Sequence, residues 1–446
     1  METPICDFIN EYAGKDTARF HMPGHKGKSH LGFEKFDITE VFGADSLYHA
    51  DGIIKKSEDN ATRIFGSGRT LYSTEGSSHV IRAMVYLAKL YNGGKSNYIL
   101  AGRNAHSSFI SACALNDVDV QWLYPDGESS YLSAVVTPEI LEKTLGGVDK
   151  TPICVYVTSP DYLGNMCDIS ALARVCKSYG TILMVDNAHG AYLKFLKDDL
   201  HPISLGAHIC CDSAHKTLPV LTGGAYLHIS KDAPGEFFEC AKDTLSLFGS
   251  TSPSYLTLAS LDNSNLYLSQ DFTARLNEFL ERMHYLVASL SCPAIIPFSP
   301  LQEPMKIVLE TKKIGYRGTD FAKILESKGI MCEFCDHDFV VLMPSVENGI
   351  NEVEKLISVL FEIEQREPIC EPSIRLIPPK KNLSIRDAFY AKKERVPIER
   401  ALGRTLAVSC VSCPPAVSLI VSGEEFDKAT IDLCKKYGFE SFWVVK

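Results

Sequence analysis

Residues 152–190, with the sequence PICVYVTSPDYLGNMCDISALARVCKSYGTILMVDNAHG, decide the fold. Segments 152–160 and 181–190 begin with short, nearly continuous apolar runs of strand length. Between them, residues 169–180 have apolar residues at helical spacing and end at Gly180. A strand, a helix and a second strand in this order predict two parallel strands in a sheet that is covered on both faces.

The same rhythm extends outward over residues 60 to 230, where 96–102 predicts a strand and 107–116 a helix. From residue 260 the pattern changes, because 260–290 predicts one long helical stretch and short strands and helices follow. We predict an α/β protein with a mainly parallel sheet and a smaller α+β C-terminal domain. The expected parts are an N-terminal segment (1–50), a large domain (51–265) and a C-terminal region (266–446).

Composition argues against several classes of protein. The net charge of the 446 residues is -10 and the basic residues are scattered, so a nucleic-acid footprint is not supported. No apolar run reaches about 18 residues, and residues 1–12 do not resemble a signal peptide, so no membrane span or secretion is expected. The 15 cysteines are an odd number, which favours reduced thiols and a cytoplasmic protein.

Two CxxC pairs, Cys332/Cys335 and Cys410/Cys413, could together supply four zinc thiolates. The first pair lies in a segment that predicts a strand through apolar residues 340–343, and the second is followed directly by two prolines. Neither pair has the turn glycine that usually shapes a zinc knuckle. We therefore favour buried thiols and predict no metal site.

Three segments place polar residues where predicted strands end, namely 73-STEGSSH-79, 183-LMVDNAHG-190 and 209-ICCDSAHKTL-218. Ligands of open α/β sheets bind beyond the carboxyl ends of the strands. In the first segment, Gly76, Ser77 and Ser78 precede a helical pattern. Such a helix start can bind phosphate, although an ordinary serine N-cap is the alternative.

The second segment places Asp186 at the end of an apolar strand. Opposite a pyridine nitrogen this acid would keep the nitrogen protonated; the alternative is a helix cap or an ion pair. Ala188 is small enough for a planar ring to lie against it. His189 could contact substrate, orient Asp186 or be a core histidine.

The third segment contains Lys216, which could form a Schiff base, whereas a lone lysine is usually at the surface. Ser213 and His215 are close enough in sequence to reach a phosphate on the captured ring. His106, in 102-GRNAHSSF-109, follows another predicted strand and could stack on that ring. A phosphate loop, a ring stacker, an acid and a lysine in this order predict covalently held pyridoxal 5'-phosphate (PLP).

At these residues the chain resembles the Orn/Lys/Arg decarboxylase family, class III of the PLP-dependent amino-acid decarboxylases, with the aspartate aminotransferase-like fold (fold type I). The resemblance covers nearly the whole chain and is most specific in HMPGHKG and SAHKT. The segments that carry it are 20-FHMPGHKGK-28, 37-DITEVFGADSLYHADGII-54, 102-GRNAHSS-108, 185-VDNAHGAYLKF-195, 213-SAHKTLPVLTGGAYLHI-229, 250-STSPSYLTLASLD-262, 329-GIMCEFCDHDFVVLM-343, 401-ALGRTLAV-408 and 413-CPPAVSLIVSGEEF-426.

The resemblance implies decarboxylation of arginine, lysine or ornithine to an amine, and a role in polyamine biosynthesis. It implies that Lys216 is the Schiff-base lysine, Asp186 the pyridine-nitrogen acid, His106 the ring stacker and Ala188 the residue under the opposite face. The implied phosphate ligands are Ser77, Ser78, Ser213 and His215. Glu424 resembles the acid near the substrate's distal cation; the alternative reading is a helix-capping glutamate.

The resemblance also implies a homodimer with shared active sites, in which HMPGHKG and STSPSY serve the neighbouring subunit. The chain looks like the short members of the family, which lack an N-terminal wing domain, so a dimer or small oligomer is expected rather than a large ring assembly.

The sequence departs from the family pattern around the substrate. Glu75 precedes Gly76 where asparagine is usual, and Gly223 replaces a common glutamine. Cys413–Ala416 replaces Tyr-Pro-Pro-Gly, and Ser422 replaces the proline of Pro-Gly-Glu. The substrate therefore stays open. So do two other functions: an aminotransferase, with Arg375 or Arg404 holding the α-carboxylate, and an inactive PLP-binding paralogue with a regulatory role.

Overall fold

A computed structural model describes the chain over residues 1–446, except 128–129, 372–377 and 410–414. Two compact units are present, each built from two separate stretches of chain: residues 1–95 with 169–275, and residues 96–168 with 276–446. The domain boundaries expected after residues 50 and 265 stay a prediction. Within the described ranges, no helix has both the length and the apolar character that crossing a lipid bilayer requires.

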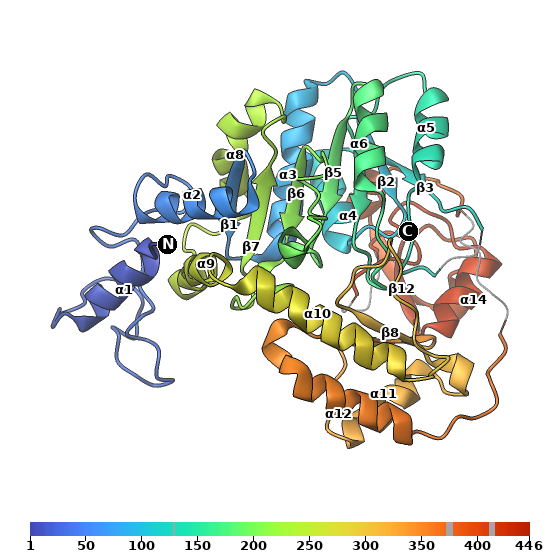
Figure 1. Ribbon diagram of the computed structural model, residues 1–446. Coiled ribbons are helices and arrows are strands. Elements are labelled where there is room, and N and C mark those ends of the chain that lie inside the picture. The colour runs from blue at the N-terminus through green and yellow to red at the C-terminus, as the bar shows by residue number, and fades with distance from the viewer. Residues whose placement is uncertain (128–129, 372–377, 410–414) are drawn as a thin grey trace. The chain divides into compact units, whose positions relative to one another are not determined.

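The first unit contains a sheet with helices around it (Figure 1). Its elements are α1 (Pro4–Gly14), α2 (Ile53–Phe65), β1 (Arg69–Ser73), α3 (Gly76–Asn92), α6 (Ile169–Ser178), β5 (Ile182–Asp186), η1 (Ala191–Phe195), β6 (Ile209–Asp212), α7 (Ala214–Thr217), β7 (Ala225–Ile229), α8 (Gly235–Phe248) and α9 (Tyr255–Leu268). The strands follow the order β1-β7-β6-β5. Strands β5 and β6 are parallel, whereas β7 is antiparallel to both β1 and β6.

The sequence explains why these elements form. Every residue of β5 and β7 is buried, which agrees with their continuous apolar runs. Helix α3 buries one face, including Val80, Met84 and Leu87, and lies beside α8 (Figure 1). It ends at Asn92, and the next residue, Gly93, has a left-handed backbone that closes the helix and that residues with a side chain disfavour.

The described part of the second unit contains a group of parallel strands and two antiparallel sheets. Its elements are β2 (Tyr98–Gly102), α4 (Ser107–Asn116), β3 (Asp119–Leu123), α5 (Pro138–Gly146), β4 (Cys154–Thr158), α10 (Phe272–Ser289, in this unit from Leu276), β8 (Ile307–Glu310), η2 (Thr311–Ile314), α11 (Gly318–Ser327), β9 (Phe334–Cys335), β10 (Phe339–Leu342), η3 (Val346–Asn348), α12 (Gly349–Glu362), α13 (Ile385–Tyr390), β11 (Lys393–Pro397), η4 (Ile398–Arg400), α14 (Lys428–Lys436) and β12 (Ser441–Val445).

Strands β4, β2 and β3 are neighbours in that order, and β2 is parallel to β3 and β4. The sheets β8-β10-β9 and β11-β12 are antiparallel. The parallel strands β2–β4 and β5–β6 confirm the prediction of a mainly parallel α/β sheet. The two antiparallel sheets confirm the expected α+β character of the C-terminal region.

Two local predictions were wrong. The helical stretch 260–290 consists of two helices, because α9 ends at Leu268 and α10 begins at Phe272. The segment 332–343 is a hairpin rather than one strand, since β9 pairs antiparallel with β10. Its turn is made by Asp336, whose carboxylate accepts the backbone N–H groups of Asp338 and Phe339, both at 2.8 Å.

Candidate active site

Strand pairing in the first unit brings three predicted segments to one edge of the sheet. Ser73 at the end of β1 pairs with Ala225, and Asp212 at the end of β6 pairs with Tyr226. Asp186 at the end of β5 pairs with Cys211. The carboxyl ends of β1, β5 and β6 therefore meet where β7 begins, as expected for a ligand site in an α/β sheet.

Two hydroxyl groups meet at the predicted phosphate site. The Oγ atom of Ser213 donates to Oγ of Ser77 at 2.7 Å, and Ser77 and Ser78 lie in the first turn of α3. At Gly76, whose φ is +74°, no described atom lies within 4 Å of the position that a Cβ would take. Hydroxyls beside the start of a 17-residue helix, with open space at its first residue, form an arrangement that can bind a phosphate.

Glu75 turns its charge toward another segment. Its carboxylate accepts the backbone N–H of Ser250, at 2.6 Å, in the segment STSPSY. This departure from the family pattern therefore has a local structural role, since Glu75 connects the phosphate loop to that segment.

Gly223 brings the loop after Lys216 close to the predicted phosphate loop. Its carbonyl accepts the backbone N–H of Gly76 at 2.7 Å. Its φ is +96°, and a Cβ there would lie 2.6 Å from the carbonyl oxygen of Thr74. This backbone therefore requires glycine where the family commonly has glutamine.

We expect Gly223→Ala to lower the stability of the protein. The substitution places a methyl group against a backbone oxygen at a φ that L-residues rarely adopt, which costs about 1–3 kcal/mol. Calorimetry should show a lower Tm than for Gly235→Ala, because Gly235 has open space around it within α8. Equal melting temperatures for the two variants would contradict this reading of the loop.

Asp186 is the acid at this edge and is only 2% exposed. Its Oδ1 atom accepts the backbone N–H of Ala188 at 3.2 Å and the thiol of Cys211 at 3.5 Å. Burial raises the pKa of Cys211, so the thiol keeps its proton and acts as a donor to Asp186. The carboxylate is thus held in one orientation by the next turn and by the neighbouring strand.

Lys216 lies in the short helix α7, directly after β6. Its Nζ atom is 3.0 Å from Nε2 of His189, so the structure brings together two predicted catalytic residues. His215 points its Nδ1 atom at the carbonyl of Gly224, 3.0 Å away. Burial, together with the charge of Lys216, lowers the pKa of His215.

His106, in the second unit, is the N-cap of α4, and its side chain is partly buried. Its Nδ1 atom accepts the backbone N–H of Ser108 at 3.1 Å and lies 2.7 Å from the Ser108 hydroxyl. The backbone N–H of Ser107 donates to the carbonyl of Ala416. The ring orientation is therefore set by the helix start and the adjoining C-terminal segment.

Glu424 is paired with a residue that the sequence analysis did not single out. Its Oε2 atom accepts from Nη2 of Arg103 at 3.0 Å and from the backbone N–H of Val421 at 2.7 Å. Both side chains are about 5% exposed, and Arg103 also donates to the carbonyls of Ser418 and Leu419. Burial raises the pKa of Glu424, while Arg103 opposes that rise.

The alternative role of Glu424 as a helix cap is wrong, because Asp427 is the N-cap of α14 and accepts the backbone N–H of Thr430. Arg404 donates to Glu394 and to the carbonyl of Val445, both at 2.8 Å. Arg375, Cys410 and Cys413 lie outside the described residues. Cys332 and Cys335 are free thiols linked by a hydrogen bond, and they are partly exposed, so the prediction of buried thiols was wrong for this pair.

Sequence reasoning missed Arg103, Cys211, Asn187 and Asp212. Arg103 and Asp212 each carried a signal, since a charged residue beside an apolar strand needs a buried partner. Those partners lie far away in the sequence, as Glu424 does from Arg103.

Comparison with known proteins identifies the family of the chain. The family model described as "Orn/Lys/Arg decarboxylase, major domain" matches residues 3–300, and the corresponding C-terminal domain matches residues 378–437. The uncharacterized protein YaaO of Bacillus subtilis is 29% identical, over 97% of this chain and 93% of its own length. The arginine decarboxylase of the same organism is 26% identical, over 95% of this chain and 91% of its own length.

Solved structures confirm the fold class. The lysine decarboxylase LdcF of Francisella novicida superposes with a TM-score of 0.78 at 19% identity, covering 100% of this chain and 81% of that chain. The constitutive lysine decarboxylase of E. coli gives a TM-score of 0.79 at 18% identity, covering 100% of this chain and 82% of that chain. The aspartate aminotransferase-like fold is thus confirmed, and the family models, matched over both the major and the C-terminal domain, show that the chain belongs to the Orn/Lys/Arg decarboxylase family.

Proposed function

We propose that this decarboxylase uses pyridoxal 5'-phosphate to remove the α-carboxylate of a basic amino acid, arginine, lysine or ornithine, as CO2. The observation that carries the proposal is the meeting of Lys216, Asp186 and the Ser77–Ser213 hydroxyl pair at one edge of a sheet. Relatives named arginine decarboxylase support a basic substrate.

The residues at this edge fit the cofactor by their chemistry. Lys216 offers the amine that captures an aldehyde, and Asp186 offers a buried carboxylate for a ring nitrogen. Ser77, Ser78 and Ser213 offer hydroxyls beside a helix start, with open space at Gly76 for an anion. We propose that Ala188 lies under one face of the ring, that His106 stacks on the other and that His215 adds a phosphate contact.

The bound cofactor supplies an electron sink for the bond that breaks. Asp186 would keep the ring nitrogen protonated, and Cys211 and the Ala188 amide hold the carboxylate in place for this task. Lys216 would hold the cofactor through its amine, and the same amine would be the group that supplies a proton to Cα. His189, 3.0 Å from the Lys216 amine, is placed to exchange that proton.

The function is tested by release of CO2 from arginine, lysine and ornithine, each supplied with PLP and without a keto acid. We expect one of the three to be consumed with equimolar amine formation. Turnover that requires a keto-acid acceptor would favour an aminotransferase instead. Absence of turnover with all three, in a protein that still binds PLP, would favour the inactive paralogue.

Glu424 is proposed to bind the distal cation of the substrate. Both hydrogen bonds from described residues fall on Oε2, and no described residue bonds to Oε1. One carboxylate oxygen thus holds Arg103 while the other can accept a second cation. We expect Glu424→Gln to raise KM by about a hundredfold, since breaking a buried charge pair costs roughly 3–5 kcal/mol.

A second variant separates this role from structural support. Glu424→Gln also leaves Arg103 buried without its partner, so Tm should fall. In Arg103→Gln/Glu424→Gln, two neutral amides can pair, and Tm should recover while KM stays high. Recovery of KM together with Tm would show that Glu424 acts only through Arg103.

We also propose a cytoplasmic homodimer. The support is the match to the family's major domain, which includes HMPGHKG and STSPSY. Exposed Phe20 and Phe42 in the N-terminal segment are available for burial by a second subunit. Light scattering on dilute enzyme should give twice the chain mass, and a fully active monomer would contradict the proposal.

A further inference from the structure

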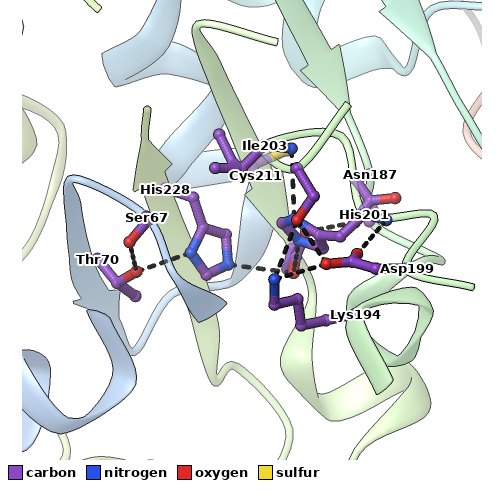
Figure 2. A network of polar contacts seen from close by, with 12 residues as sticks. Ser67, Thr70, Asn187, Lys194, Asp199, His201, Ile203, Cys211 and His228 are labelled. Carbon is purple, nitrogen blue, oxygen red and sulfur yellow. Dashed lines mark hydrogen bonds and ion pairs between the residues drawn. The ribbon is translucent and has the colours of Figure 1, made fainter. Parts of the chain in front are cut away.

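A buried polar cluster lies at the end of β6, shortly before Lys216 in the sequence, and Figure 2 shows His201, His228 and Asn187, which belong to it. At its centre the carboxylate of Asp212, which is 0% exposed, accepts from three side chains. His201 Nε2 and His228 Nε2 lie 3.0 and 3.1 Å from Oδ2, and Asn187 Nδ2 donates to Oδ1 at 2.7 Å. All four residues belong to the first unit.

The outer nitrogen of His201 fixes the proton position of that imidazole, and a hydroxyl pair lies against the outer nitrogen of His228. The backbone N–H of Ile203 donates to Nδ1 of His201 at 3.4 Å, so this nitrogen carries no proton and Nε2–H points at Asp212. The hydroxyl of Thr70 lies 2.8 Å from Nδ1 of His228, and Ser67 bonds to that hydroxyl in turn. Asp199 further holds His201 in place by accepting its backbone N–H.

This pattern describes a carboxylate with three donors rather than a metal site. His201, Cys210 and Asp212 are close enough to bind an ion. However, a histidine that ligates through Nε2 normally donates its Nδ1–H to an acceptor, whereas Nδ1 of His201 accepts. Burial alone would raise the pKa of Asp212. His201 and His228 outweigh that effect and keep the pKa below its ordinary value, so the Asp212 carboxylate is charged.

The cluster is connected to the active site through Asn187. Successive residues of a strand point to opposite faces of a sheet. Accordingly, Cys211 contacts Asp186 on one side of the strand pair, and the next residue, Asp212, holds Asn187 on the other. Cys211 thus holds Asp186, the last residue of β5, and Asp212 holds Asn187, the residue that follows it.

The amide of Asn187 fills the turn that follows β5. Its Oδ1 atom occupies the space in which a Cβ of residue 190 would lie, which explains the glycine there. The backbone N–H of Gly190 donates to the carbonyl of Asn187 at 2.8 Å and closes the turn. Ala188 and His189, which are proposed to meet the ring and to contact Lys216, are the two residues inside this turn.

We infer that Asp212, clamped by His201 and His228, is a positioning residue for the decarboxylation site. It orients Asn187 and, through the turn 187–190, the residues Ala188 and His189. The inference rests on the proposed function, because PLP is the group that the turn is positioned to receive. No part of the cluster needs to touch that cofactor.

The test is the Kd for PLP, measured by titrating the apoprotein and following absorbance, alongside the Tm of the same apoprotein. In Asp212→Asn a single amide oxygen must replace two carboxylate oxygens, so at least one of the three donors loses its acceptor. We expect Kd to rise about tenfold, as a buried unsatisfied donor costs roughly 1–3 kcal/mol. Asn187→Ala removes the link alone and should raise Kd by a similar factor, even if Asp212→Asn folds poorly.

The double variant and a matched control decide whether Asp212 acts through Asn187. If it does, Asp212→Asn/Asn187→Ala should bind PLP no more weakly than the worse single variant, whereas multiplied losses would overturn the inference. Thr70→Val deletes the outer bond of His228 and spares the Asp212–Asn187 bond. It should lower Tm yet leave Kd within about twofold.

Three further outcomes are informative. If the Kd for PLP rises in proportion to the fall in Tm in all the variants, Thr70→Val included, the cluster serves stability alone and the inference is overturned. One equivalent of a transition metal per chain in the purified wild type would overturn the hydrogen-bonded assignment. If wild type itself failed to bind PLP, the proposed function would fall first, which distinguishes the two failures.

Discussion

Lys216→Ala should lose the covalent attachment of PLP and nearly all turnover. Lys216 is fixed by α7, and its amine lies 3.0 Å from His189, at the edge where Asp186 and the proposed phosphate ligands also lie. Alanine offers neither an amine for the cofactor aldehyde nor a proton for Cα. Loss of the general acid alone lowers rates by about 10²–10⁴-fold, and loss of the covalent link adds to this.

Borohydride reduction followed by peptide mass spectrometry measures the attachment directly. In wild type the phosphopyridoxyl group should be found on the peptide that contains Lys216. Lys231→Ala, which removes an exposed lysine of the same unit, should keep both the label and the activity. A labelled Lys216→Ala chain would mean that another lysine holds the cofactor.

The strand ends of the site were predictable because they depend on local pattern. Asp186 follows five buried residues of one apolar run, and Lys216 follows the strand that ends at Asp212. Gly76 and the serines after it begin a helix, as expected. Once the sheet is parallel, geometry alone brings such ends to one edge, so the position proposed for the site follows from short-range information.

The side-chain partners were not predictable in the same way. Asp212 finds His201, His228 and Asn187 through tertiary folding, and His201 lies in an irregular segment with no periodicity. Arg103 and Glu424 are 321 positions apart. Sequence indicates that a buried charge needs a partner, but the register of the sheet decides which residue supplies it.

The wrong local predictions have physical causes as well. In 336–338 the sequence Asp-His-Asp interrupts the apolar run, and its carboxylate–backbone bonds favour a turn over a continuous strand. Between α9 and α10, residues 269–271 are Ser-Gln-Asp, and polar side chains of this kind compete with helical hydrogen bonds. Helical spacing continues across the break, so periodicity alone concealed it.

Asp186→Asn should keep the cofactor but lose most of the activity. Asparagine has nearly the same shape and can accept the Ala188 N–H and the Cys211 thiol as Asp186 does. It carries no charge, however, so it cannot hold a proton on the ring nitrogen, and the electron sink weakens. We expect kcat to fall about 10²–10³-fold, the range found when one preorganised electrostatic partner is removed.

A cofactor analogue tests the reason for that loss. PLP methylated at the ring nitrogen is permanently cationic and needs no carboxylate to stay so. Bound to Asp186→Ala, which leaves room for the methyl group, the analogue should restore activity that PLP itself does not. Cys211→Ala is the matched control, because it removes a donor to Asp186 and leaves the charge in place, so kcat should fall less than in Asp186→Asn. Wild-type activity in Asp186→Asn, or failure of the analogue in a variant that binds it, would show that Asp186 is not the group that keeps the ring charged.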